Sequence, residues 1–283
     1  MPNERKLSAD SSVDALLKRL PSSLYRYSGL GGDRLEWMRR LVADSEWYFA
    51  APSLFNDPLD FKISTSFEAP GDVIEKHWRD LAEKSFASMP AEEKEARIQG
   101  LIRDSGTSDG RKRLEERLLG VLARNGTACL ATDPTSMLMW SYYADGHKGA
   151  AVRFGMDLDR ILALGTAFKE QGTDLFPVEV DYEEEFPNCN YYTADKHERI
   201  KVVLGTKSAA WKHEGEWRIV LPGRCDCYLK IPPQMITGVI LGMRIGATEE
   251  ETIRGWLAKR SPRVELLRVV HKPNSFRLEL AAA

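Results

Sequence analysis

The sequence predicts an α+β protein: one domain with a mixed or antiparallel central sheet and a charged helical insertion. Its segments rich in aromatic and β-branched residues do not alternate regularly with helical segments, which argues against a doubly wound parallel sheet. Residues 71–125 differ from the rest, because they are dense in Glu, Lys and Arg and contain no long apolar stretch. With 283 residues, 43% of them hydrophobic, the chain is long enough to bury the core of one large domain.

The first part of the chain is expected to form a helical lead and then the beginning of the domain. Residues 1–21 start with a polar segment and continue as a short amphipathic helix that Pro21 ends. The α+β domain is therefore predicted to span residues 22–283. Its first segments show aromatic strand patterns on either side of a helical pattern. The strands are expected at 24–27 and 46–50, and the helix at 35–42.

The insertion and the segments after it complete the predicted fold. Residues 71–125 are expected to form two or three amphipathic helices, with breaks at Pro90 and at 105–110. Strand patterns return after the insertion, and two helical patterns lie among them. The strands are expected at 128–132, 150–154, 178–182, 217–221, 239–241 and 264–270, and the helices at 195–204 and 249–259.

Composition limits the classes of function. Lys plus Arg is 40 against 42 for Asp plus Glu, so the formal charge of −2 provides no electrostatic case for general nucleic-acid binding. No apolar run approaches the roughly 20 residues needed to cross a bilayer, and the polar N-terminus lacks a secretory signal. Four cysteines do not make a disulfide framework, and Cys225 and Cys227 are too close together for usual zinc spacing. We therefore expect a cytoplasmic protein without a membrane partner or a bound metal.

The first polar cluster follows the predicted strand at 46–50. Residues 51–60 read Ala-Pro-Ser-Leu-Phe-Asn-Asp-Pro-Leu-Asp, and Asn-Asp-Pro is typical of a tight turn. A turn explains the pattern without any function. Alternatively, the loop presents Asn56, Asp57 or Asp60 at the edge of the sheet, where functional groups often lie.

The second cluster combines aromatic residues with hydrogen-bonding groups. It spans residues 137–149, and helical spacing would bring Trp140 and Tyr143 to the same side as His147. Gly146 would then end the helix. A flat aromatic wall with polar tips suits a stacking ligand such as a base or a nicotinamide ring. A structural role for the histidine is the alternative.

The third cluster contains two carboxylates two residues apart. If Glu214 and Glu216 are both extended, their side chains face the same way, with Gly215 between them. Their repulsion would raise one pKa unless Arg218, on the same face, pairs with it. Such a pair suits glycosyl transfer, in which a carboxylate stabilises an oxocarbenium ion. A salt-bridged strand edge is the alternative.

Taken together, the clusters resemble a large bacterial family, domain-of-unknown-function family 2971. The resemblance covers roughly residues 22–245, and the ordered set is specific although each piece alone is not. One departure is Tyr142, which stands where the family pattern Trp-Ser-His-Tyr-Ala has His. The family carries no established activity. The matching residues are Leu24-Tyr25-Arg26-Tyr27, Phe55-Asn56-Asp57-Pro58, Met139 to Ala144 with His147 and Gly149, and Trp211 with Glu214, Glu216, Trp217 and Arg218.

A looser resemblance, at the level of the fold, is to ADP-ribosyltransferases. In that superfamily an early strand offers Arg or His to the ribose or phosphates of NAD, and a late Glu, often within Glu-x-Glu, drives transfer. The resemblance implies that Arg26 takes the first position and that Glu216, preceded by Glu214, takes the last. Ser53 or Tyr48 would take the middle position, which supports the nicotinamide ring.

Three hypotheses of function follow. The first is an NAD-consuming transferase acting in stress or phage defence, in which Arg26 binds the phosphates and Glu216 stabilises the ribosyl cation. Its acceptor would be a protein or a nucleic acid. The second is a non-enzymatic module that binds a ligand or a partner in such a system. The third is a nucleic-acid-processing enzyme with magnesium on Asp57, Asp60 and Glu216. The residues expected to bind the nucleotide are Arg26, Tyr48, Ser53, Asn56, Trp140, Tyr143, His147 and Arg218, with Tyr48 or Trp140 stacked on the nicotinamide.

Overall fold

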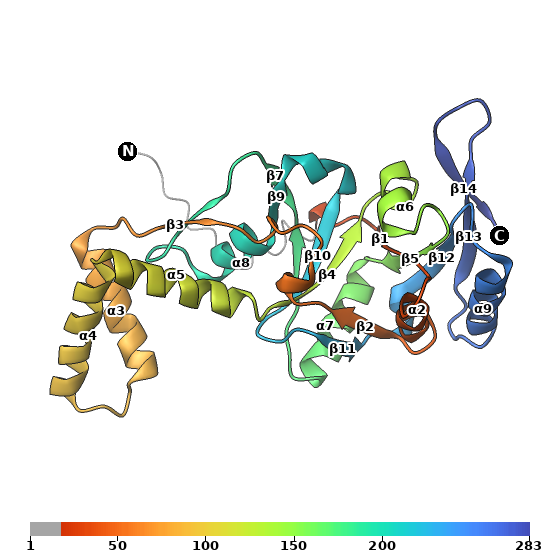
Figure 1. Cartoon of the computed structure of the whole chain (residues 1–283). Coiled ribbons are helices and arrows are strands. Elements are labelled where there is room, and N and C mark those ends of the chain that lie inside the picture. The colour runs from red at the N-terminus through yellow and green to blue at the C-terminus, as the bar shows by residue number, and fades with distance from the viewer. Residues whose placement is uncertain (1–17) are drawn as a thin grey trace.

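The computed structural model describes residues 18–283 and is built around an eight-stranded sheet. The strand order is β14-β13-β12-β5-β1-β4-β10-β6 (Figure 1). Every neighbouring pair is antiparallel except β12 and β13, so the predicted mixed α+β architecture is confirmed. Most of the predicted N-terminal helix lies outside the described residues. The strands are β1 (Ser23–Ser28), β4 (Gly126–Ala131), β5 (Ala150–Gly155), β6 (Phe176–Glu179), β10 (Glu216–Leu221), β12 (Ile236–Leu241), β13 (Glu265–His271) and β14 (Leu278–Ala282).

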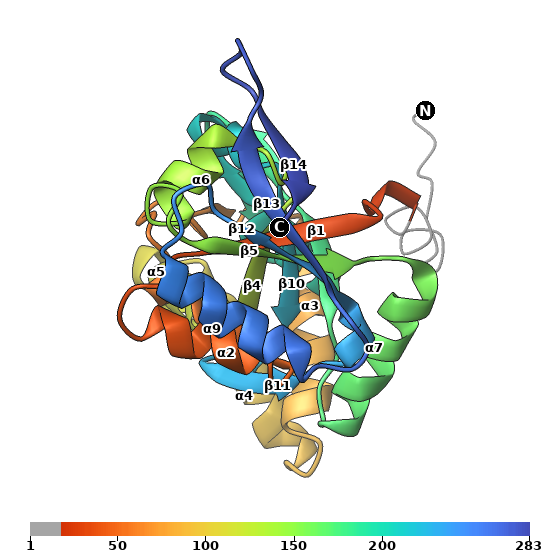
Figure 2. The same ribbon diagram turned by 90° about the vertical axis from the view of Figure 1, so that its right-hand side faces the viewer.

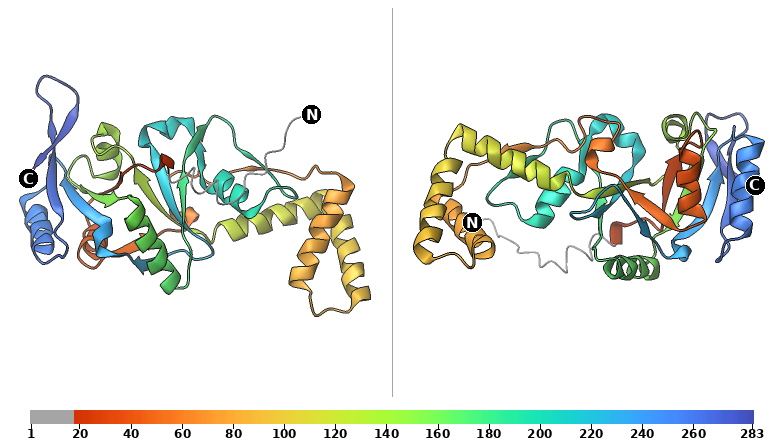
Figure 3. Two further views of the ribbon diagram at one scale, coloured as in Figure 1. Left: turned by 180° about the vertical axis from the view of Figure 1, so that it is seen from behind. Right: turned by 60° about the horizontal axis from the view of Figure 1, so that its bottom comes forward.

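One face of the sheet carries the larger core. Three helices and a two-stranded ribbon cover it, and Figures 2 and 3 show the helices α2, α7 and α9 on this side. Phe154 of the sheet stacks on Trp47 of the ribbon, with ring centroids 4.6 Å apart. Burial of such rings is the main stabilising term of a core. The elements are α2 (Arg34–Val42), α7 (Leu158–Glu170), α9 (Ala247–Ala258), and the ribbon of β2 (Glu46–Phe49) and β11 (Cys227–Lys230).

The opposite face is covered by shorter elements. The helix α6 (Met137–Tyr143) packs Trp140, which is fully buried, against Tyr27 of β1. Near β10 and β6, the helix α8 (Lys196–Leu204) covers a separate group of buried hydrophobic residues. The site described below lies between these two coverings.

The charged insertion consists of three helices, as its composition predicts. They are α3 (Gly71–Ser85), α4 (Ala91–Ser105) and α5 (Ser108–Leu122). Pro90 precedes α4, and the Thr107 side chain caps α5 by accepting a hydrogen bond from the Gly110 backbone. The insertion has a small core of its own around Trp78, and Figure 1 shows α3 and α4 at the far end of the molecule from the C-terminal hairpin.

Several elements differ from the expectation. The strand expected at 178–182 is divided into two strands with different partners. Residues up to Val180 bond to β10, and the residues after it form β7, which pairs with β9. The strand expected to end the chain is followed by β14, which folds back on it. Helix α7, capped by Asp157, was not predicted. The other short elements are η1 (Pro52–Leu54), β3 (Ser64–Ser66), β7 (Asp181–Glu183), β8 (Asn188–Asn190), β9 (Thr206–Ser208), η2 (Ala209–Glu214) and η3 (Pro233–Met235). Within residues 18–283, no helix is long and apolar enough to cross a membrane.

Candidate functional site

The sheet splits between two of its central strands, and the candidate site lies at the split. The strands β1 and β4 pair only at Tyr25 and Ala131, whereas β1 pairs with β5 and β4 with β10 along their whole lengths. The resulting cavity has a volume of about 290 Å³. It is lined by Arg26 and Tyr27 from β1, by Thr127 and Cys129 from β4, and by residues from all three polar clusters.

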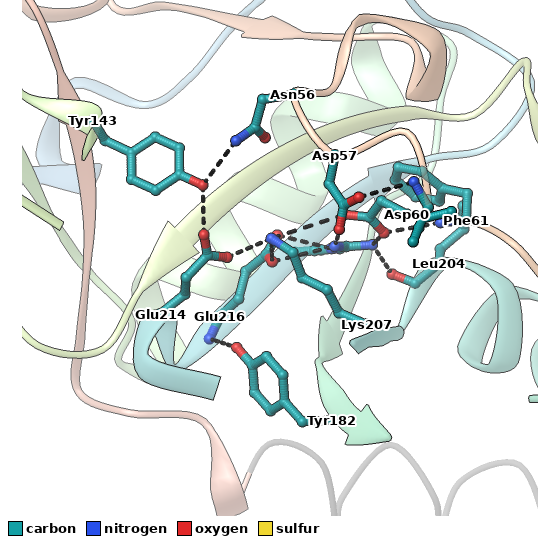
Figure 4. Close-up of polar contacts among 12 residues, drawn as sticks. Asn56, Asp57, Asp60, Phe61, Tyr143, Tyr182, Leu204, Lys207, Glu214 and Glu216 are labelled. Atoms are coloured by element: carbon teal, nitrogen blue, oxygen red, sulfur yellow. Dashed lines mark hydrogen bonds and ion pairs between the residues drawn. The ribbon is translucent and has the colours of Figure 1, made fainter. Parts of the chain in front are cut away.

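Glu214 and Glu216 form one wall of this cavity, although by a different geometry from the one expected. The prediction that both residues are extended is wrong, because Glu214 ends the 3-10 helix η2 and Glu216 begins β10. Gly215 between them has a left-handed φ of 51°, and a side chain there would collide with the Thr132 hydroxyl. The two carboxylates still converge, because the Lys207 ammonium bonds to both of them, 3.2 Å from Oε2 of Glu216 (Figure 4).

Behind Glu216, Arg218 closes a buried ionic network. Its guanidinium donates to Oε1 of Glu216 at 2.8 Å and to Oδ2 of Asp60 at 2.7 Å. A further bond of 2.9 Å goes to the Leu204 carbonyl oxygen. Because Arg218 is completely buried and shares its donors among these acceptors, its role is to support Glu216 from behind.

The charges of the network shift the pKa values of its two glutamates in opposite directions. Burial works against ionisation of Glu216, but Arg218 and Lys207 outweigh it and hold its pKa below the usual range. Burial raises the pKa of Glu214, and the nearby ammonium of Lys207 only partly offsets this effect. The network contains three carboxylates and two cations, so its net charge of −1 depends on Glu214 being ionised.

Two tyrosines connect the network to its surroundings. The Tyr143 hydroxyl donates to Oε1 of Glu214 at 2.5 Å and accepts a 3.3 Å bond from the amide of Asn56 (Figure 4). The Tyr182 hydroxyl accepts a 2.8 Å bond from the backbone nitrogen of Glu216. Burial raises the pKa of Tyr182 to about 12, and burial together with Glu214 raises that of Tyr143, so both stay protonated.

Arg26 faces the same cavity from the other side of the split. Among the residues that the structure describes, its guanidinium has no hydrogen-bond or ion-pair partner. Burial lowers the pKa of Arg26, because no carboxylate offsets the lost hydration. A cation of this kind on a cavity wall is available to an anionic ligand. Arg26 also lines a second cavity, together with Tyr48.

The remaining residues expected at the site lie elsewhere. Trp140 is wholly buried, and its indole nitrogen donates to the Pro134 carbonyl at 2.9 Å. Helix α6 ends at Tyr143 rather than at Gly146, and His147 follows it with a left-handed φ of 69°. The His147 ring stacks on Trp140 with centroids 6.2 Å apart and does not line the cavity. Ser53 is exposed and borders a separate cavity.

Sequence reasoning assigned no role to Lys207, the residue that joins both glutamates. Its strand β9 is only three residues long and pairs with β7, so no strand pattern marked it. Lys207 is followed within ten residues by Glu214 and Glu216, and this excess of charge before a buried strand was the available signal.

The carboxylates expected to hold magnesium do not form a metal site. Asp60 and Glu216 do come together, but Arg218 and Lys207 occupy their oxygens. Asp57 accepts a bond from the Leu59 backbone nitrogen instead. Within the described part of the chain, no group of three His, Cys, Asp or Glu side chains is placed to hold a metal ion.

Comparison with known proteins finds one family model that matches part of the chain and no activity. Residues 139–219 match the family model described as "Protein of unknown function (DUF2971)". The match confirms the family resemblance noted in the sequence over these residues, which include the third polar cluster and all of the second except its first two residues. No curated protein and no solved structure matches the chain.

Proposed function

We propose that this protein is an ADP-ribosyltransferase-like enzyme that consumes NAD in the cavity between β1 and β4. The observation that carries the proposal is the juxtaposition of Arg26 with Glu214 and Glu216, which line one cavity although they lie far apart in the sequence. An unpartnered cation faces an anionic network across a space suited to a small ligand. This arrangement matches a substrate with phosphates at one end and a developing positive charge at the other.

The proposed reaction breaks the bond between the nicotinamide nitrogen and C1′ of the ribose. The bonding electrons leave with neutral nicotinamide, and positive charge develops on the ribose as an oxocarbenium ion. An acceptor nucleophile then bonds to C1′ and gives up its proton. Fixed negative charge stabilises such a transition state more than it stabilises the ground state.

The surroundings of each residue indicate its role in the proposed reaction. Arg26 binds the phosphates, because it is the unpartnered cation of the cavity. Glu216 supplies a fixed negative charge, since Arg218 and Lys207 keep it ionised. Glu214 accepts the proton of the acceptor, because its raised pKa makes it the better base. Tyr143 holds the Glu214 carboxylate in place.

The reaction is tested by mixing the purified protein with NAD and measuring free nicotinamide by chromatography. Glu216→Gln and Arg26→Ala, each with its fold verified by circular dichroism, serve as variants. We expect release by the wild type and its loss in both variants. Release that falls only in proportion to lost folded protein would contradict the assignment. The acceptor is a protein or a nucleic acid, and the setting is the cytoplasm, in keeping with four free cysteines.

A binding module without turnover is the second candidate. It is favoured by one observation: both oxygens of Glu216 already accept hydrogen bonds inside the protein. A module of this kind would bind NAD or a related nucleotide through Arg26 and leave it intact. NAD recovered unchanged from a saturated complex, with no nicotinamide released, would select this function.

A further inference from the structure

A second cavity adjoins the first and is walled by aromatic rings. It has a volume of about 540 Å³ and lies between α2 and the ribbon of β2 and β11. Arg26, Ala50 and Leu54 line both cavities, so Arg26 stands where the two meet. We call the second cavity the aromatic chamber; its rings belong to Trp37, Trp47, Tyr48 and Tyr228.

Two of these rings are held rigidly. The Tyr48 hydroxyl donates to Oδ1 of Asp226 at 3.1 Å, and the rings of Tyr48 and Tyr228 lie 4.9 Å apart. The guanidinium carbon of Arg40 lies 3.4 Å from the centre of the Tyr228 ring on β11. Fixed rings lose little conformational freedom when a planar ligand stacks on them.

Trp37 is a large aromatic side chain that is exposed rather than packed in the core. It projects from α2 at the chamber with 52% of its surface exposed, and Leu54 beside the junction is 62% exposed. Trp47 also borders the chamber, but its ring is buried in the core and stacks on Phe154. The chamber therefore offers an open aromatic face at Trp37.

The one acidic side chain of the chamber does not oppose an anionic ligand. Oε2 of Glu46 lies 2.7 Å from Arg40 and Oε1 lies 3.2 Å from Lys230. Hydrogen bonds from both cations lower the pKa of Glu46 and neutralise its charge locally. Arg26, which has no such partner, remains the charge that a ligand meets at the junction.

We propose that the aromatic chamber binds the purine base of a nucleoside diphosphate whose phosphates lie on Arg26. Stacking against Trp37 would hold the base. The ligand class follows from the order of the features: aromatic chamber, cation, then carboxylate cavity. For the proposed reaction, this order puts the adenine end of NAD in the chamber and the nicotinamide end at Glu214. The orientation rests on the proposed function, but the base site does not.

The test is calorimetric titration of the full-length protein with ADP, which lacks the scissile bond. We expect Trp37→Ala to weaken ADP binding about 5- to 140-fold, because stacking on an aromatic ring contributes ~1–3 kcal/mol per base. Trp37→Phe keeps a ring and should restore most of the affinity. Phe276→Ala removes an exposed ring that borders neither cavity, so this matched control should bind ADP like the wild type. Ribose 5-phosphate, which has no base, should bind weakly and equally to the wild type and to Trp37→Ala.

The outcomes separate this inference from the proposed reaction. Equal ADP binding by the wild type and Trp37→Ala, or no ADP binding at all, would overturn the base site even if NAD is cleaved. ADP binding that depends on Trp37, in a protein that releases no nicotinamide, would keep the base site and remove the proposed reaction.

Discussion

Arg26, which is partly buried, and Arg218, which is fully buried, lie near the same cavity, yet their environments are opposite. Burial alone would lower the pKa of both guanidiniums. For Arg218, the carboxylates of Glu216 and Asp60 more than reverse this effect and raise its pKa. For Arg26, no carboxylate of the described residues 18–283 is near, and its pKa is lowered. Within this part of the chain, the fold thus pairs Arg218 completely and provides no counter-ion for Arg26.

The difference separates structural charge from charge available for binding. A buried ion pair contributes little net stability, but breaking it is costly because one charge is left alone. An unpaired cation destabilises the folded state slightly unless a ligand neutralises it. By this argument Arg218 supports the structure of the cavity, whereas Arg26 is available to bind the ligand. The predictions below test this division.

The largest expected effect is on stability and should appear at only one of the two arginines. Arg218→Met leaves Asp60 and Glu216 buried with Lys207 as their single remaining cation among the described residues, so we expect a loss of ~3–5 kcal/mol in the free energy of unfolding. Arg26→Met removes an unpaired charge and should leave stability within about 1 kcal/mol of the wild type. Urea denaturation of both variants measures the difference. Equal losses would mean that Arg26 has a structural role after all.

The next effect is on catalysis at Glu214. Glu214→Gln keeps the size of the side chain and its contact with Tyr143, but it cannot accept a proton. We expect nicotinamide release to an acceptor to fall about 10²–10⁴-fold, the range typical of general base catalysis. Asp60→Asn, which alters the network away from the cavity, is the matched control and should lower stability more than turnover. A Glu214→Gln variant with full activity would exclude this role.

The pH dependence of activity should move when Lys207 is changed. The rate requires ionised Glu214, so it falls as the pH drops through the Glu214 pKa, which lies above the usual glutamate value. Lys207 lowers that pKa, so Lys207→Met should shift the acid limb of the pH–rate profile to higher pH. Between the ordinary and the raised pKa, the folded protein binds more protons than the unfolded chain. The contribution of Glu214 to stability therefore decreases as the pH rises through this window. An unmoved acid limb would mean that another group titrates.

The smallest expected effect concerns the tyrosine that contacts Glu214. Tyr143→Phe removes one hydrogen bond to the carboxylate and also the acceptor for Asn56. We expect about a 12- to 140-fold decrease in kcat with little change in KM, since a hydrogen bond to a charged group contributes ~1.5–3 kcal/mol. Tyr142→Phe, on the exposed neighbour, is the control and should behave like the wild type. A decrease of the same size in both variants would contradict the assignment.

Much of the fold could be predicted from local patterns. The insertion was predictable because charge density, Pro90 and the break before α5 are local signals. Helix α7 was missed although Ile161, Leu164 and Phe168 have helical spacing. The division of the strand at 178–182 depends on pairing with β9, a contact that no local pattern contains.

The candidate site was predictable only in part. Glu214 and Glu216 were singled out because paired carboxylates suit glycosyl transfer, and Arg26 through the resemblance to ADP-ribosyltransferases; all three line one cavity. Lys207 and the aromatic chamber could not be found in this way, because short strands and the position of α2 are set by long-range packing. The aromatic residues around Trp140 suggested a ligand wall, but in the fold this ring fills the core.

The central claim is that Arg26 holds an anionic nucleotide while Glu214 acts on it. Its most direct test is to titrate NAD into the wild type, Arg26→Met and Glu214→Gln by calorimetry, and to measure nicotinamide in the same samples. We predict that the wild type binds and cleaves NAD, that Glu214→Gln binds without cleaving, and that Arg26→Met does neither. NAD binding of equal affinity in the wild type and in Arg26→Met would contradict the account.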